Sequence, residues 1–343
     1  MKLVLVNSIG PMGCACTCSI IEHLGYINLP VRKRQLTQYV LGKKDLNDNY
    51  FKKKTLELIN IYSMPRRIGG TSVFDRELNL PKKLYDKNLI KNELDFFMNK
   101  KYSNISDMYF DSMTLFNKAT IYKKKILKPL GSIEQIIDIH NFYNFNIYEK
   151  YMEHFKDIVF INLDRNFFTW ISAISGQNFM RDKLSFNDLK FGLIKYYDLY
   201  LNHINYFEKL KGYNYKFEEI FLPNTKNFIK DLCLKLYSKE IANYELLTYD
   251  SYGHMYDYNS QFTYQDQFLQ FLSDKTINFA KYIIQKYNNG NKFLSFLCQL
   301  LFQFFYLRDL LVFRKKNKKV IKHEILKEDF YSNIKKNDYK KKF

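Results

Sequence analysis

The most constraining feature of the sequence is the order of its first three segments, an apolar strand, a loop of small residues and a helix. Lys2–Val6 is apolar almost throughout, which predicts a central strand buried on both faces. Asn7–Thr17 follows as the loop, and Cys18–Leu24 is expected as a helix that Gly25 can end. This order begins a β-α-β unit and therefore predicts an α/β fold with a parallel sheet.

The rest of the chain continues the alternation of strands and helices. Ile158–Leu163 is the strongest predicted strand, preceded by a helix ending near Phe155 and followed by an apolar helix. Tyr213–Phe217 is expected as a further short strand. The other expected helices span residues 46–62, 85–100 and 105–125 (both exposed), 132–139, 185–210, 227–237 and 276–286. The order of the strands in the sheet does not follow from these patterns.

The chain is strongly basic, with a net charge of +19 over 343 residues. Its hydrophobic fraction of 46% excludes a mainly disordered protein. The positive charge favours anionic partners, such as nucleic acids, phospholipids, or phosphorylated and sulfated small molecules. No nucleic-acid-binding motif accompanies the charge, so nucleic acid is not expected as a partner.

Three of the five cysteines stand at alternate positions, Cys14, Cys16 and Cys18. Their spacing does not form a disulfide framework, and the apolar run before Asn7 is too short for the core of a signal peptide. A cytoplasmic location is therefore expected. Thiolates beside a helix N-terminus can bind metal or react, with His23 nearby, but tight packing under a phosphate loop is the favoured interpretation. No bound metal is expected.

The C-terminal part joins an apolar segment to a basic tail. Phe293–Phe313 is apolar apart from Gln299, Gln303, Arg308 and Asp309, which argue against a helix that spans a membrane. From Arg314 onward, twelve Lys and Arg residues stand against four Asp and Glu, a net charge of +8. Two interpretations remain open: a core helix with a solvated tail, or peripheral attachment of residues 293–322 to an anionic membrane surface. Residues 1–290 are expected to form the α/β domain, and 291–343 the helix and tail.

The loop after the first strand has features of a phosphate-binding loop. Gly10 and Thr17 match the pattern GxxxxGK[ST], whereas Ala15 replaces the second Gly and Cys16 replaces the Lys. Small residues let backbone N–H groups close around a phosphate at the start of a helix. Without the Lys, the site of an ordinary nucleoside triphosphatase is not expected here. The alternative is a tight turn of small residues packed under a helix.

A second candidate position follows the strongest strand. Arg165 lies at its carboxyl end, where open α/β sheets bind ligands, and Ser172 and Ser175 follow on the next helix. The planar guanidinium group matches two phosphate oxygens at once, and a serine hydroxyl can add a hydrogen bond. The alternative is a surface ion pair between Asp164 and Arg165.

Taken in this order, these segments resemble the sulfotransferases that use 3′-phosphoadenosine 5′-phosphosulfate. The family's PRSGT[ST] loop corresponds to residues around Gly13 and to Cys14, Ala15, Cys16 and Thr17, and its middle signature resembles 155–166. Its YEDL strand, with the following Pro and helix, resembles 215–236, and a Lys-x-Pro segment resembles Lys128-Pro129.

The resemblance, which covers roughly residues 1–290, implies a P-loop-type three-layer fold, helix-rich and with a central parallel sheet. It also implies 3′-phosphoadenosine 5′-phosphosulfate as co-substrate. Gly10, Gly13 and Cys14–Thr17 would hold its phosphosulfate, and Arg165 with Ser172 or Ser175 would hold its 3′-phosphate.

Transfer of a sulfuryl group to a hydroxyl of a glycan or small metabolite further needs a base and a cation on the leaving phosphate. Candidate bases are His140, Glu77 and Asp75. The loop has neither Lys nor Arg at Met12 or Gly13, so Arg66-Arg67 is the expected source of the cation. That pair stands beside residues 69–72, a second loop that itself resembles PRSGTS. A non-catalytic protein that binds nucleotides or polyanions on the same fold remains the alternative function.

Overall fold

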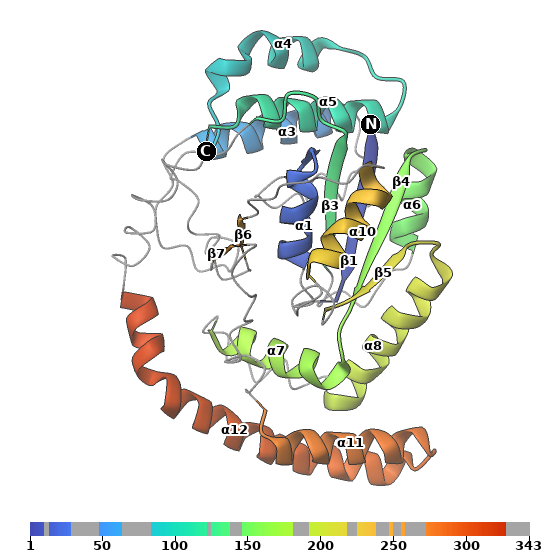
Figure 1. The fold of residues 1–343 in the computed structure, drawn as a ribbon, viewed down its shortest axis with the longest axis vertical. Helices are drawn as coiled ribbons and strands as arrows, with labels where there is room; N and C mark the ends of the chain where they lie inside the picture. Colours follow the sequence, from blue (N-terminus) through green and yellow to red (C-terminus); the bar gives the residue numbers. More distant parts are fainter. Residues whose placement is uncertain are drawn as a thin grey trace.

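A five-stranded parallel sheet forms the centre of the protein (Figure 1). The computed structural model describes residues 1–9, 14–28, 48–63, 84–121, 125–137, 146–180, 192–217, 225–237, 247–249, 255–257 and 272–326. The strands are β1 (Lys2–Ser8), β2 (Tyr26–Ile27), β3 (Gly131–Ile137), β4 (Ile158–Asp164) and β5 (Tyr213–Lys216). Their order is β2-β3-β1-β4-β5, and every neighbouring pair is parallel. The expected α/β fold with a central parallel sheet is confirmed.

Helices cover both faces of the sheet and give three layers. On one face, the core shared with the sheet includes α1 (Cys14–His23) and α10 (Thr225–Tyr237). The same hydrophobic cluster continues into α7 (Phe167–Met180) and α8 (Gly192–Lys209), and from there into α11 (Asp274–Asn288) and α12 (Lys292–Leu326), which contact α8 and each other. The other face packs against α3 (Asp48–Ser63), the short helix η1 (Lys87–Ile90), α4 (Lys91–Asn99), α5 (Ile105–Ala119) and α6 (Asn146–His154). A small antiparallel ribbon of β6 (Leu247–Tyr249) and β7 (Met255–Asp257) contacts α1 through β6.

Strand β1 shows why this sheet is buried on both faces. Val4 and Val6 point into the core on the side of α1, and Leu3 and Leu5 point into the core on the side of α5. All four side chains are fully buried, because successive residues of a strand face opposite sides. The almost continuous apolar run of β1 therefore serves two cores at once, as the sequence predicted.

The largest correction to the sequence-based prediction concerns β3. Residues 132–139 were expected to form a helix with Ser132 as its N-cap, but Gly131–Ile137 is a strand between β2 and β1. Ser132 and Glu134 are buried polar residues, and their side chains bond to the hydroxyl of Tyr109 on α5 at 3.0 Å and 2.7 Å. Polar residues are therefore tolerated in a central strand because a distant helix supplies their partner.

Several expected helices are confirmed, with changed limits or surroundings. The helices expected at 46–62, 227–237 and 276–286 are α3, α10 and α11, and the expected helix over 185–210 is described from Gly192 as α8. Helix α1 starts at Cys14 instead of Cys18, and Gly25 follows its end with φ of +101°. Helix α5 was expected to be exposed, but Tyr109, Met113 and Phe116 are buried against the sheet.

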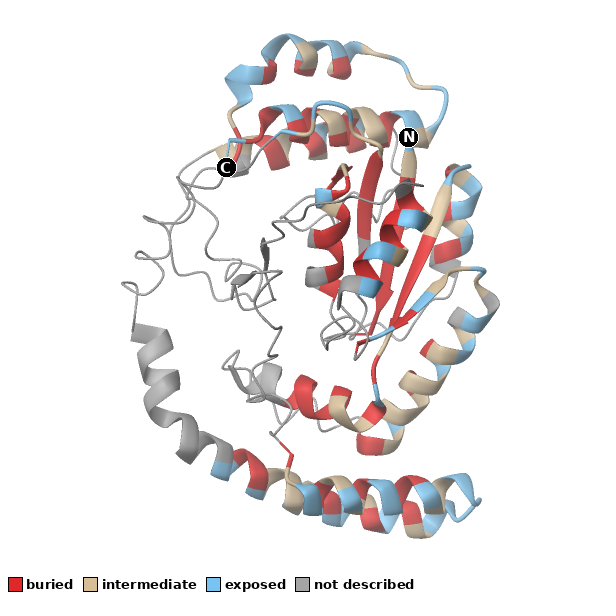
Figure 2. Ribbon diagram, in the orientation of Figure 1, coloured by how far each residue is buried: buried red, intermediate tan, exposed pale blue. Residues whose placement is uncertain are grey.

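The carboxyl ends of the strands face α7. This helix begins two residues after Arg165, which itself directly follows β4, and Figure 1 shows it lying across the lower end of the sheet. Figure 2 shows the strands buried along most of their length, whereas α11 and α12 at the bottom of the view alternate between buried and exposed positions. Any ligand site at the carboxyl edge of the sheet is therefore bordered by α7.

Candidate functional site

The strand order defines a switch point between β1 and β4. The chain leaves β1 toward β2 on one side of the sheet, and leaves β4 toward β5 on the other side. In open α/β proteins, ligands bind beyond the carboxyl ends of the two strands from which the connections diverge. The start of α1, where Cys14 bonds to Ser8, and Arg165, directly after β4, both adjoin this edge. The topology therefore brings together two segments that are far apart in the sequence.

A row of three asparagines crosses the sheet near this edge. Asn7, Asn162 and Asn214 lie in register on β1, β4 and β5. The amide Nδ2 of Asn7 donates to Oδ1 of Asn162 at 2.9 Å, and Nδ2 of Asn162 donates to Oδ1 of Asn214 at 2.7 Å. The row ties the carboxyl ends of β1 and β4 to β5. Oδ1 of Asn7 is buried and accepts no hydrogen bond from the residues that the structure describes.

The asparagine row was missed at the level of sequence. The signal was present, since Asn162 interrupts an otherwise apolar strand and Asn7 directly follows another. An amide inside a buried strand needs a partner, and that partner can be another amide on the neighbouring strand. Only the register of three distant segments reveals the pairing.

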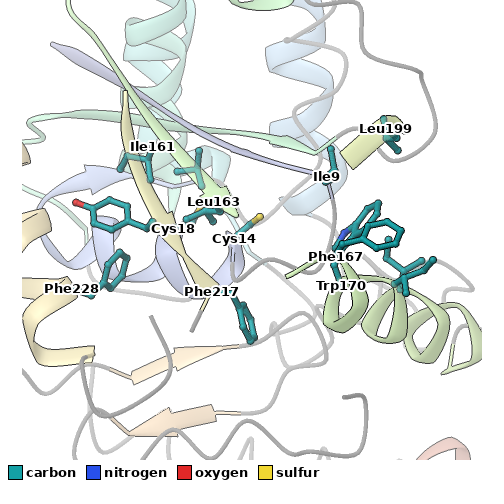
Figure 3. Packing of buried hydrophobic residues seen from close by; sticks show 14 of the residues in the cluster. Ile9, Cys14, Cys18, Ile161, Leu163, Phe167, Trp170, Leu199, Phe217 and Phe228 are labelled. Atoms are coloured by element: carbon teal, nitrogen blue, oxygen red, sulfur yellow. The ribbon is translucent and has the colours of Figure 1, made fainter. Parts of the chain in front are cut away.

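The first turn of α1 carries a buried hydroxyl group that has no hydrogen-bond partner among the residues that the structure describes. Thr17 is 0% exposed, and its Oγ1 atom forms no hydrogen bond with any of them. Cys14, at the start of the same helix, donates its thiol hydrogen to Oγ of Ser8 and so joins α1 to the end of β1. Figure 3 shows Cys14 and Cys18 beside Leu163 of β4, so the first turns of α1 pack over the centre of the sheet.

Arg165 is fully buried just beyond β4. Its guanidinium carbon lies 3.9 Å from the centre of the Phe217 ring, which directly follows β5, and its Nε donates to Oγ1 of Thr169 at 3.2 Å. Stacking on the ring fixes the plane of the guanidinium group. A buried positive charge thus stands at the carboxyl edge, held by residues from the neighbouring strand and from α7.

Asp164, the neighbour of Arg165, bonds to the backbone of the turn after β4 and to α8. Its Oδ1 accepts the backbone N–H of Arg165 at 2.6 Å and the hydroxyl of Tyr200 on α8 at 3.1 Å. These contacts tie the carboxylate to the turn after β4 and to the helix behind it.

The two serines expected near the 3′-phosphate lie on α7 with hydrogen bonds inside the protein. Oγ of Ser172 accepts the backbone N–H of Leu272 at 3.2 Å, and Oγ of Ser175 donates to the carbonyl of Ile171 at 2.8 Å. Both side chains are buried. In this structure the hydroxyl of Ser172 joins α7 to the segment before α11, and the hydroxyl of Ser175 bonds within its own helix.

The remaining predicted site residues fall outside what the structure describes. This holds for Gly10, Gly13, Arg66, Glu77 and His140, and also for Asp75. Ala15 and Cys16 belong to α1, of which the backbone is described at these positions. Cys14, Cys18, Cys233 and Cys298 are buried and form no disulfide, and no group of three or more His, Cys, Asp or Glu side chains among the described residues could hold a metal ion.

A buried histidine behind β4 makes stability depend on pH. His203 on α8 places Nε2 3.0 Å from the carbonyl oxygen of Leu163, and burial lowers its pKa from 6.5 to about 4, against a smaller opposite effect of that hydrogen bond. Below pH 6.5 this histidine is protonated in the unfolded chain, whereas in the folded protein it stays neutral down to about pH 4. Above this pH, the free energy of unfolding therefore keeps the full contribution of the neutral His203. It should fall by about 3 kcal/mol as the pH approaches 4.

Urea unfolding at about pH 7 and about pH 4.5 measures this loss, with His203→Gln as the matched variant. Glutamine can donate to the same carbonyl but does not titrate, so the variant should lose clearly less stability on acidification. An equal loss in both proteins would show that other groups cause the acid sensitivity.

No protein-family model, no curated protein and no solved structure matches this chain.

Proposed function

We propose that the carboxyl edge between β1 and β4 binds the phosphate groups of a nucleotide, and that the protein is a sulfotransferase. Its donor would be 3′-phosphoadenosine 5′-phosphosulfate, and its acceptor a hydroxyl of a glycan or small metabolite. The observation that carries the proposal is the hydroxyl of Thr17, fully buried in the first turn of α1 and without a hydrogen-bond partner among the described residues. Thr17 is also the residue that ends the resemblance to the phosphosulfate loop.

The position of Thr17 favours an anion as its partner. A buried hydroxyl with no hydrogen bond costs about 1–3 kcal/mol, so a folded protein rarely keeps one without use. The N–H groups and the dipole at the start of α1 attract negative charge. A phosphate oxygen placed there would accept from both the helix and the threonine.

Arg165 would supply the second contact. Its charge is buried at the same edge, and its stacking on Phe217 holds the fork of N–H donors in one plane. Such a fork suits two phosphate oxygens. The proposed donor carries two separate phosphate groups, one for the start of α1 and one for Arg165.

The proposed reaction needs little covalent chemistry from the protein. The acceptor oxygen would form a bond to sulfur while the bond from sulfur to the bridging phosphate oxygen breaks. The electron pair stays on the phosphate of adenosine 3′,5′-bisphosphate, and the hydroxyl proton passes to a base. His140 and Glu77 are the proposed bases, and Arg66 the proposed cation at the leaving phosphate.

A non-catalytic nucleotide-binding protein is the second candidate. Two observations favour it: Ser172 and Ser175 already bond within the protein, and the loop before α1 has no Lys or Arg. Both candidates predict binding of adenosine 3′,5′-bisphosphate. They differ in whether 3′-phosphoadenosine 5′-phosphosulfate is converted to the bisphosphate when hydroxyl-bearing acceptors are added, which chromatography of the nucleotides measures.

Thr17→Val tests the site itself. Without ligand the variant should be as stable as the wild type, or more stable by about 1 kcal/mol, because it removes a buried hydroxyl that has no hydrogen bond. Adenosine 3′,5′-bisphosphate should stabilise the wild type by about 2.7 kcal/mol at a hundred times its Kd, and the variant clearly less. Thermal unfolding with and without the nucleotide measures both effects.

Thr55→Val is the matched control. Thr55 is equally buried, but its Oγ1 donates to the carbonyl of Phe51 and pairs with Oγ of Ser112, both at 3.0 Å. This variant should lose stability and keep the response to the nucleotide. If the nucleotide stabilises Thr17→Val as much as the wild type, or does not stabilise the wild type at all, the proposed site is wrong.

A further inference from the structure

Helix α12 is attached to the body of the protein along one of its faces. Its buried residues include Ser295, Cys298, Phe302, Asp309 and Leu310, and it packs lengthwise against α11 and at one end against α8. Figure 1 shows the α11–α12 pair as the outermost element beyond α7. The inner face of α12 therefore belongs to the protein core.

Two polar residues in the apolar part of α12 have partners on the body. The carboxylate of Asp309 accepts the backbone N–H of Ser273, the N-cap residue of α11, at 2.7 Å and the hydroxyl of Thr276 at 2.6 Å. Oε1 of Gln299 accepts the backbone N–H of Ile194 in the first turn of α8, at 3.1 Å. These bonds join α12 to the starts of two other helices and hold it in place.

The outer face of α12 is apolar and exposed. Phe293, Phe296, Leu300, Phe304 and Leu311 recur at intervals of three to seven residues along one side, and Phe293 and Phe304 are 75% and 71% exposed. Figure 2 shows exposed positions along this helix. A helix that is apolar on both faces needs a second apolar environment, since one face alone contacts the protein.

We propose that this outer face lies in the surface of a membrane that contains anionic phospholipids. The sequence in the same helix continues from the apolar stripe directly into the basic run 314–319, and the chain from Arg314 onward carries a net charge of +8. A helix that lies in a membrane surface has two parts. Its apolar side chains enter the lipid boundary, and its basic residues contact the headgroups.

Two alternatives to attachment at the membrane surface are a second copy of the chain on this face and a helix that crosses the membrane. A second copy of the chain seated on this face would bring two segments of charge +8 together, which like-charge repulsion opposes. Within α12, Lys292–Val312 is long and apolar enough to cross a membrane by length and composition. Crossing would, however, carry Asp309 and Gln299 away from the starts of α11 and α8, to which they are hydrogen-bonded.

Flotation of the full-length protein with phospholipid vesicles tests the proposal. The wild type should float with vesicles of phosphatidylcholine and phosphatidylserine, and much less with phosphatidylcholine alone. Replacement of Phe293, Phe296 and Phe304 by Gln should weaken binding on the order of tenfold for each residue. Replacement of Lys315, Lys316 and Lys319 by Gln should weaken it about fivefold for each residue on the anionic vesicles.

The matched control is Phe96→Gln, which removes a phenylalanine that is 68% exposed on α4 at the other end of the molecule. It should bind vesicles as the wild type does, and thermal unfolding should show all variants folded. The proposal is wrong if the wild type does not float, or if the triple Phe variant floats equally well. A dimer seen by ultracentrifugation and lost in the triple Phe variant, without flotation, would assign the face to a second copy instead.

Discussion

Arg165→Ala is expected to abolish the stabilisation that adenosine 3′,5′-bisphosphate gives to the wild-type protein. The guanidinium group is a fully buried charge at the carboxyl edge of the sheet, held flat against Phe217. Loss of a charged, two-pronged contact to phosphate should weaken binding by about 3 kcal/mol, or on the order of 100-fold. Calorimetric titration of the folded variant measures the affinity directly.

Two further variants separate charge from geometry. Arg165→Lys keeps the positive charge but loses the planar fork and its stack on Phe217, so its affinity should fall between those of the wild type and Arg165→Ala. Arg308→Gln removes another arginine, one on α12 that bonds to Asp309 and Ser273, and should leave the affinity unchanged. Equal affinity of Arg165→Ala and the wild type would remove Arg165 from the site.

Gly131→Ala is expected to have the largest effect on folding. A Cβ atom at this position would lie 1.8 Å from the carbonyl oxygen of Lys2 and 2.7 Å from its carbonyl carbon. Both are backbone atoms of β1 at the point where it pairs with β3. Unlike the end of a flexible side chain, they cannot move aside to make room for the Cβ atom. The pairing of the two central strands should break at this end, with a loss of more than about 4 kcal/mol.

The control for this prediction is Gly290→Ala, between α11 and α12. A Cβ atom there meets nothing within 4 Å, and only the φ of +80° opposes it, which costs about 1 kcal/mol. Urea unfolding of the three proteins gives the comparison. Similar small losses in both variants would mean that β1 and β3 separate easily at Gly131.

Local patterns predicted the elements whose burial is uniform along the chain. The continuous apolar runs of β1 and β4 predicted strands buried on both faces, and both segments are strands. A helix follows β1 as expected, but β1 extends to Ser8 and the helix already begins at Cys14, so most of the expected loop over Asn7–Thr17 was wrong. The same logic failed for β3, because Ser132, Glu134 and Gln135 look polar and helical in isolation. Their place in the sheet depends on Tyr109, which donates to Glu134 from a helix more than twenty residues earlier.

The features of the candidate site also divide into those that were predicted from sequence and those that only the structure shows. Thr17 and Arg165 were found from sequence because each directly follows a recognisable strand and loop. The asparagine row, the stacking of Arg165 on Phe217 and the engagement of Ser172 by Leu272 were not predictable. Each joins segments far apart in the chain, and spacing along the sequence carries no information about such pairs.

The sequence by itself determined that this chain forms an α/β protein around a parallel sheet, with small residues after its first strand and an apolar helix before a basic tail. Periodicity and composition are local properties, so they are readable without the fold. Only the tertiary structure decided that β1 lies between β3 and β4, and that one face of α12 packs against the protein while its other face is exposed. Strand order and helix packing depend on crossovers between distant segments, whose contacts exist only once the chain has folded.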